Sequence, residues 1–294
     1  MSSHLSSGFA QRLHRMFTRF PVNDTRYLTA IFFLLGAIFF TINGLLYVFA
    51  YTEPKLFYRP LSLPATSCIG DFLFILGCTS AIFEAMNTEK RALANGVVVE
   101  LDLEIAQETA LKAEPEAGST ELVKSLAFLE ERVSTPAVAH SQNVLIGDPS
   151  FTWIPSRRNF RDIAFIASVI WFIGIIFFTI ATIAYIPGVA NLGNLDTYYY
   201  LALLPTFLGG LFFLVAAFIN MLLSQKKWYV PAVTKLDWHV GFWNSIGSLG
   251  FALGGCLWYV GESAYFAAVL ASFWGAWGWV IGSVLRWYVV MGSY

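Results

Sequence analysis

The chain has 294 residues and a formal net charge of −1; 57% of its residues are hydrophobic and 13% are charged. A soluble domain carries charge on about a quarter of its residues, so this composition excludes an ordinary soluble protein. The apolar residues gather in six long runs with almost no charge inside them, unlike the alternating segments of about ten residues in barrel strands. The sequence therefore predicts an all-α, polytopic membrane protein.

Residues 1–26 form a basic arm ahead of the first run. A helix over Gly8–Phe20 would place Arg12, Arg15 and Arg19 largely away from an apolar face, which consists of Phe9, Leu13, Met16, Phe17 and Phe20. Such a helix suits an anionic membrane surface; alternatively, the arm only fixes the orientation of the first span. The first run is longer than the roughly 7–15 apolar residues of a cleavable signal, so we expect it to be retained.

Each apolar run is long enough to cross a hydrocarbon core of about 30 Å, which takes roughly 20 residues. In chain order the predicted spans are Tyr27–Tyr51, Ser67–Ala85, Ile163–Ile186, Tyr198–Leu223, Val240–Val260 and Ala264–Val284.

The distribution of Lys and Arg predicts the orientation, because these residues are retained on the cytoplasmic side. The arm carries four, the second connection eight, the fourth three and the C-terminal end one, which makes sixteen. The first connection carries two, and the third and fifth carry none. Both termini are therefore predicted to be cytoplasmic, or on the equivalent side of an organelle membrane.

Segments of the spans recur along the chain. Leu35–Tyr47 (LGAIFFTINGLLY) and Ile173–Tyr185 (IGIIFFTIATIAY) are identical at seven of thirteen positions, and Ile246–Trp258 keeps the glycine and the central phenylalanine. The even-numbered spans also align in their small and aromatic residues, over Gly70–Gly77, Gly209–Ala216 and Gly275–Gly282.

The repeating unit is a helical hairpin, present at residues 27–85, 163–223 and 240–294, the last with a short C-terminal tail. Each hairpin would begin on the cytoplasmic side, so the three repeats are parallel and related by an axis along the membrane normal. We therefore predict six helices around a pseudo-threefold axis.

Residues 86–162 form a polar cytoplasmic loop, and residues 224–239 form a shorter cytoplasmic connection. The loop is compatible with two amphipathic helices, Val97–Ala113 and Glu121–Val133. It contains no Gly-rich phosphate loop, no metal-ligand spacing and no basic cluster with interleaved aromatics, so no nucleotide or nucleic-acid partner is indicated.

Small residues mark the fifth and sixth spans, where Gly-x-x-x-Gly spacing allows two helices to approach closely. They are Gly247, Gly250, Gly254, Ala271, Gly275, Gly278 and Gly282. Helix packing is the favoured interpretation, with a flexible or permeation role as the alternative. A partner protein or a second copy could also use these faces, and the lipid bilayer is the expected surrounding.

Polar residues at membrane depth are the candidate site residues, because an intramembrane ionisable group is costly unless it is paired or faces water. Asp71, one turn inside the second predicted span, and Asn43, near the middle of the first, are the candidates for a polar cavity. Glu84 and His239, near the cytoplasmic ends of their helices, are weaker candidates.

The sequence indicates no cofactor and no metal. The three cysteines, Cys68, Cys78 and Cys256, have no Cys-x-x-Cys spacing, and no catalytic arrangement can be proposed from spacing.

The segment Gly70–Gly77 (GDFLFILG) resembles the second helix of the YrhK-like domain, a small two-helix membrane module. Trp238–Gly247 and Phe273–Gly282 are similar to uncharacterised fungal integral membrane proteins. The resemblance implies a membrane module and brings no activity or catalytic residue with it.

Two classes of function follow. The first is a non-enzymatic membrane protein, either a transport or channel-like bundle or a scaffold, with an unknown ligand. The alternative is a membrane-embedded enzyme for a lipid or isoprenoid substrate, which would need acidic and histidine side chains clustered at the cytoplasmic helix ends. Only Glu84, His239 and Asp237 are available for that role.

Overall fold

The computed structural model describes residues 2–52, 62–112 and 145–294. All regular structure in these ranges is helical. The chain forms two compact units, one of Met1–Met86, Thr152–Gly292 and Tyr294, and the other of Asn87–Phe151 with Ser293. The first unit contains the helix bundle described below.

The helices follow one another as α1 (Ser2–Thr18), α2 (Thr25–Thr52), α3 (Ser62–Lys112), η1 (Asn159–Arg161), α5 (Ile163–Ala184), α6 (Leu195–Tyr198), η2 (Tyr199–Leu203), α7 (Leu204–Leu223), α8 (Leu236–Trp258), η3 (Glu262–Ala264) and α9 (Tyr265–Met291).

Six segments of the described chain are long and apolar enough to cross a membrane, which confirms the six predicted spans. They are Thr25–Thr52, Ser62–Thr88, Ile163–Ala184, Leu195–Leu223, Leu236–Trp258 and Glu262–Met291. Lipid offers the backbone no hydrogen-bond partners, so apolar segments of this length satisfy their own N–H and C=O groups as helices. The protein is a multi-pass membrane protein.

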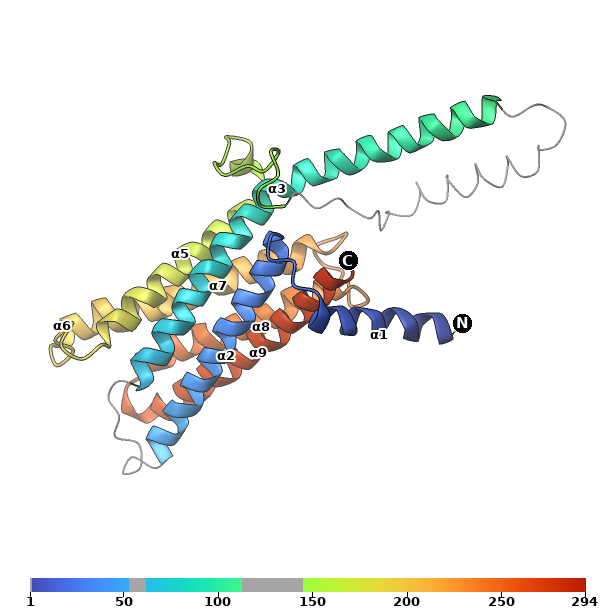
Figure 1. Ribbon diagram of the computed structural model, residues 1–294. Coiled ribbons are helices and arrows are strands. Elements are labelled where there is room, and N and C mark those ends of the chain that lie inside the picture. The colour runs from blue at the N-terminus through green and yellow to red at the C-terminus, as the bar shows by residue number, and fades with distance from the viewer. Residues whose placement is uncertain (1, 53–61, 113–144) are drawn as a thin grey trace. The chain divides into compact units, whose positions relative to one another are not determined.

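The six spans form a closed ring in which neighbours run antiparallel (Figure 1). Gly36 of α2 faces Phe74 of α3, Gly44 of α2 faces Phe273 of α9, and Gly210 of α7 faces Ala252 of α8. Buried contacts also join α3 to α5, α5 to α7 and α8 to α9. The order around the ring is therefore the order in the chain: α2, α3, α5, α7, α8 and α9.

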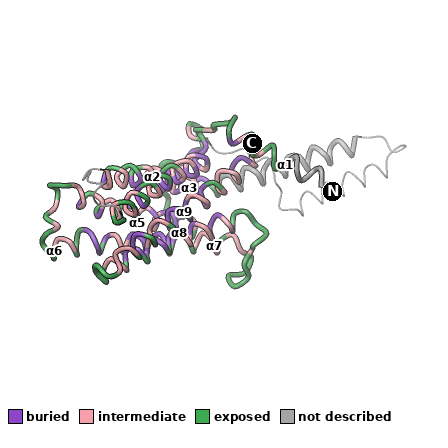
Figure 2. Tube along the Cα trace, turned by 90° about the horizontal axis from the view of Figure 1, so that it is seen from below, coloured by how far each residue is buried: buried purple, intermediate pink, exposed green. Residues whose placement is uncertain are grey.

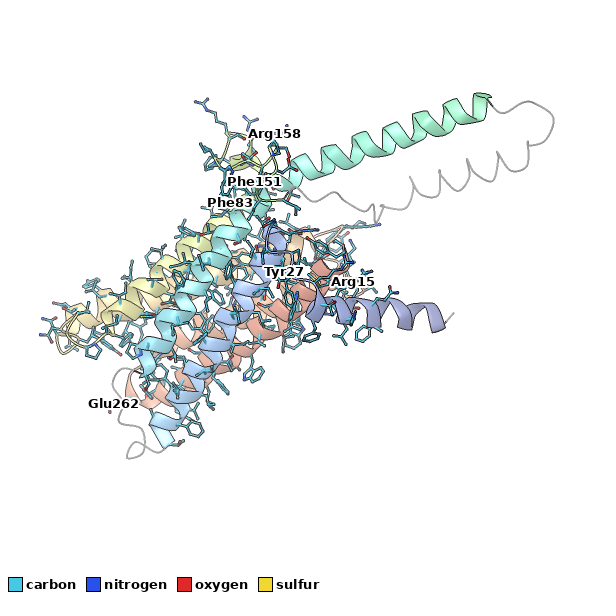
Figure 3. The ribbon with its side chains drawn as sticks, in the orientation of Figure 1. Arg15, Tyr27, Phe83, Phe151, Arg158 and Glu262 are labelled. Carbon is cyan, nitrogen blue, oxygen red and sulfur yellow. The ribbon has the colours of Figure 1, made fainter. Side chains whose placement is uncertain are left out.

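This up-and-down arrangement gives the bundle two ends. We call the end where α2, α5 and α8 begin the proximal end, and the end where they finish the distal end. Figure 3 shows Arg15 and Tyr27 at the proximal end and Glu262 at the distal end. Burial follows the same geometry, since buried residues line the inside of the ring and exposed residues mark the connections (Figure 2).

Several helix boundaries differ from the predicted ones; α9, for example, continues to Met291, beyond the predicted end at Val284. Helix α3 begins at Ser62 instead of Ser67 and continues without a break to Lys112, so the first part of the polar loop extends the spanning helix. The fourth span begins with α6 and passes through one turn of π-helix, η2, before α7. The predicted helix Glu121–Val133 lies outside the described residues.

Helix α1 packs across the proximal end of α9. Of the predicted apolar face, Met16 is buried with Tyr27, Val290 and Met291, while Phe9, Leu13, Phe17 and Phe20 are exposed. The Arg12 guanidinium lies 5.7 Å from the centre of the Tyr288 ring, a cation–π distance. The rings of Phe9 and Phe17 also lie 5.6 Å and 5.9 Å from those of Tyr288 and Trp287, so the helix contacts α9 at several points while most of its apolar side chains stay exposed.

The glycine faces of α8 and α9 pack against each other, which confirms the predicted packing role. A Cβ on Gly250 would lie 2.5 Å from Cα of Gly275, and one on Gly278 would lie 2.7 Å from Cα of Gly247. Only a bare backbone allows this approach, which gains dispersion contacts that lipid cannot supply. These faces are therefore occupied within the chain and are not surfaces for another copy.

Five large aromatic rings meet inside the ring of helices. Trp279 of α9 lies with its ring centre 5.1–5.8 Å from four others, in edge-on geometry. Those four are Phe33, Phe74, Trp171 and Phe213, and all five side chains are buried. This group, called the aromatic core below, fills the axis of the bundle at its middle.

Charged side chains tie the proximal helix ends together. The fully buried Asp24 accepts hydrogen bonds from the Arg26 guanidinium, at 2.8 Å from Nη2, and from the Tyr294 hydroxyl, at 2.7 Å. Glu84 of α3 pairs with Arg286 of α9 at 2.5 Å. Burial alone would raise the pKa of Asp24, but the bonds and charge of Arg26 outweigh it and hold that pKa below its ordinary value.

The depressed pKa of Asp24 predicts acid sensitivity. The folded state favours the ionised form of Asp24 more than the unfolded chain does. Its contribution to the free energy of unfolding is therefore complete above pH ~4 and is lost as pH falls through the lower folded-state pKa. We expect Asp24→Asn to lower the free energy of unfolding at pH 7 by about 2 kcal/mol and to flatten its decline below pH ~4. Glu262→Gln, at an exposed distal position, is the control. A decline in Asp24→Asn as steep as in the parent would contradict this.

Candidate functional site

A cavity of about 140 Å³ lies in the distal half of the bundle. Side chains from all six spans line it, from Tyr47 near the end of α2 and Pro64 near the start of α3 to Trp258 at the end of α8. Phe213 belongs both to its wall and to the aromatic core. The core therefore borders the cavity on its proximal side.

Asp71 of α3 faces this cavity and is 2% exposed. Neither carboxyl oxygen has a hydrogen-bond partner among the residues that the structure describes. The Thr182 hydroxyl of α5 is near enough to interact with the carboxyl, but does not meet the geometry of a hydrogen bond. Since α3 begins at Ser62, Asp71 lies nine residues (62 to 71) and about two and a half turns inside the helix, deeper than the one turn predicted.

A buried carboxyl without a partner is expensive, whether it is charged or neutral. A lost hydrogen bond to a buried group costs about 1–3 kcal/mol, and an aspartate near the middle of a spanning helix costs about 2.5–3.5 kcal/mol in insertion experiments. Among the described residues, the nearby Thr182 hydroxyl is the one polar neighbour that acts on it, without forming a hydrogen bond. This cost marks Asp71 as the chemically important group of the cavity.

Asn43 of α2 lines the same cavity. Its side-chain nitrogen donates to the carbonyl oxygen of Leu63 and to the hydroxyl oxygen of Thr66, both on α3 and both at 2.8 Å. These bonds hold the first two spans together beside the cavity. The structure thus places both main candidates, Asp71 and Asn43, on one cavity wall, the first without a partner and the second bonded between helices.

Several polar groups of the wall were not singled out by the sequence. Thr206 and Ser272 face the cavity with hydroxyls that donate to carbonyl oxygens of their own helices, at 2.7 Å and 3.1 Å. Ser67 and Thr182 line it as well. Small hydroxyl residues are common in spanning helices because they can bond to their own backbone, so sequence alone offers no signal that separates these four.

Aromatic rings make up much of the remaining wall. Phe251 of α8 lies with its ring centre 5.8 Å from both Phe40 of α2 and Phe178 of α5, next to the aromatic core. Nearer the distal end, Tyr47 and Tyr185 line the cavity and are close enough to interact electrostatically. The carboxyl of Asp71 therefore shares its cavity with several aromatic rings.

The weaker candidates lie elsewhere. Glu84 is paired with Arg286, and His239 places Nε2 2.8 Å from the carbonyl oxygen of Val233. Asp237 lies in the exposed first turn of α8. None of these three side chains lines the cavity. Among the residues that the structure describes, no three His, Cys, Asp or Glu side chains gather in a way that could hold a metal ion.

Ring, cavity and spans together define a polytopic membrane protein with a polar site inside its bundle. Comparison of the chain with family models, curated proteins and solved structures finds no match in any of the three. The resemblance to the YrhK-like module stays a prediction.

Proposed function

We propose that this protein is a non-enzymatic transport protein that admits a small solute from the distal side into the cavity between its six spans. The observation that supports the proposal best is the Asp71 carboxyl, buried in that cavity without a partner. Intramembrane ionisable groups of this kind mark substrate and ion pathways. The aromatic core, which fills the axis on the proximal side, would then be the closed gate of the bundle.

The cavity is best explained by three parallel hairpins around a pseudo-threefold axis, α2–α3, α5–α7 and α8–α9. In each hairpin a glycine of the first helix packs against an aromatic ring of the second. The pairs are Gly36 with Phe74, Gly174 with Phe213, and Gly247 with Trp279. The three rings of these pairs belong to the aromatic core, where their centres lie 5.1–5.7 Å apart. This agreement of contacts supports an internal repeat, for which the proposed YrhK-like module would be the unit.

The three hairpins carry different residues at the position of Asp71. By the same alignment the position of Asp71 is Gly210 in the second hairpin and Ala276 in the third. A single carboxyl therefore stands beside an otherwise similar set of three walls, which supports one asymmetric binding site in place of a channel with a ring of charges.

The orientation follows from the Lys and Arg count, which places the proximal end in the cytoplasm. Helix α1 would then rest on the cytoplasmic membrane surface, with its exposed apolar residues in the interface and its arginines near anionic lipid headgroups. The cavity would open to the opposite side and be closed toward the cytoplasm.

Cysteine reactivity tests whether the cavity admits a small solute. In a parent with Cys68→Ser and Cys256→Ser, reconstituted in nanodiscs, Thr182→Cys should react with methyl methanethiosulfonate at least about tenfold faster than Ile183→Cys. The physical reason is that the thiolate is the reactive form, and it is available in a wet cavity but not in lipid. Ile183 is the matched control because it is the next residue and is 46% exposed on the outer surface of α5.

The labelling rate is read by mass spectrometry, with the parent giving the background from the buried Cys78. If Thr182→Cys reacts no faster than Ile183→Cys, the cavity does not admit solute and the proposed function is wrong.

A further inference from the structure

We infer that the solute held in this cavity is a small organic monocation of the ammonium class. The inference rests on the proposed function and names its ligand. Its basis is the juxtaposition of one unpartnered carboxyl with an aromatic wall in a space of limited size.

The charged residues that line the cavity favour a cationic ligand. Among the described residues that line the cavity, Asp71 is the only acidic one, and no Lys, Arg or His lines it. A charge this deeply buried is tolerated when an opposite charge pairs with it. Because the described residues that line the cavity include no counter-ion, a cationic ligand is the group that would satisfy the carboxylate.

The aromatic residues of the cavity wall favour a cationic ligand as well. Seven of the residues that line the cavity are aromatic, and they come from α2, α5, α7 and α8. The negative face of an aromatic ring attracts a cation, and surrounding aromatic rings are the usual means of binding quaternary ammonium groups. An anion would meet both the carboxylate and these rings as repulsive neighbours, and a neutral solute would leave the carboxylate unpaired.

The volume of the cavity limits the size of the ligand. A cavity of roughly 150 Å³ in another protein holds one benzene molecule, so about 140 Å³ accommodates a ligand of about six to eight non-hydrogen atoms. Metal cations such as Ca²⁺ and Mg²⁺ take six or more oxygen ligands. Here the described lining residues supply one carboxylate and a few scattered neutral oxygens, and aromatic carbon occupies much of the wall. A compact alkylammonium fits this environment better.

Protection of the reporter thiol tests the ligand class. The Thr182→Cys protein in nanodiscs is labelled with methyl methanethiosulfonate in the presence of choline chloride, of dimethylbutanol, in which carbon replaces the ammonium nitrogen, or of sodium chloride. We expect choline to slow labelling at a concentration at least about tenfold lower than its uncharged isostere, because only choline gains the carboxylate and cation–π attraction. Sodium chloride should not protect.

The variant Asp71→Asn, added to the reporter, should abolish the preference for choline over dimethylbutanol, since the amide keeps the shape and removes the charge. The comparison of the two probes on the reporter protein that keeps Asp71 is decisive even if that variant fails to fold.

The outcomes separate the two proposals. Equal protection by choline and its isostere, protection by sodium alone, or fast labelling that none of the three slows would each overturn the ammonium inference and leave the admission of solutes standing. A thiol that is not labelled even without any probe would overturn the proposed function itself.

Discussion

Trp279→Ala should lower the free energy of unfolding by about 3 kcal/mol, because it removes the central ring of the aromatic core. Trp279 is 0% exposed and its ring centre lies 5.1 Å from Phe74 and 5.4 Å from both Phe33 and Phe213. The expected value is at the lower end of the range for buried tryptophan, since lipid is as apolar as the core and the loss is mainly one of packing.

The matched control is Trp277→Ala, two residues away and 49% exposed. Its loss should be below about 1 kcal/mol, because the side chain lies outside the core. Denaturant titration of both variants in detergent micelles measures the difference. Equal losses for the two variants would show that the aromatic core does not stabilise the bundle as described.

The second large effect is expected from one methyl group. Gly250→Ala should lower the free energy of unfolding by about 2 kcal/mol, although alanine is the better helix former by about 1 kcal/mol. The added Cβ would lie 2.5 Å from Cα of Gly275 and 2.6 Å from the carbonyl oxygen of Ala271, both backbone atoms that cannot rotate away. Helices α8 and α9 would have to separate.

Gly8→Ala provides the opposite control. A Cβ there meets nothing within 4 Å, so only the gain in helix propensity remains, and α1 should become more helical by circular dichroism. Thermal unfolding of purified protein compares the two substitutions. A Gly250→Ala protein as stable as the parent would refute the close packing of α8 on α9.

The spans could be predicted because lipid imposes a simple requirement, about 20 apolar residues per crossing, and the sequence meets it six times. The full extent of α3 could not be predicted from the sequence, because polarity increases after Met86 while the helix continues to Lys112. The apolar pattern reports contact with lipid, whereas helix formation in the polar segment depends on local backbone preference. The two signals need not end at the same residue.

Asp71 and Asn43 could be singled out because a polar group at membrane depth has few inexpensive environments. The other residues that line the cavity could not be identified from the sequence. Thr182 and Tyr47 are residue types that spanning helices use for ordinary packing, and only the ring of six helices brings them to one wall. The ion-pair partner of Glu84 could not be predicted either, since Arg286 lies 202 residues further along the chain.

A stability cost at the site fits the proposed role. The protein keeps an unpartnered carboxyl where an apolar side chain would be better tolerated, and such sites persist when activity needs them. Satisfying Asp71 with a ligand would stabilise the bundle, whereas the aromatic core maintains the fold whether or not the cavity is filled. In the proposed function, ligand binding and the stability of the fold depend on neighbouring layers of the same axis.

The most direct measurement is a cryo-EM map of the protein in nanodiscs, recorded with choline present and with choline absent. We expect an open cavity beside Asp71, closed on the proximal side by the aromatic core, with added density next to the carboxyl when choline is present. A map in which protein side chains fill the cavity and bond to Asp71 would contradict the proposed binding site.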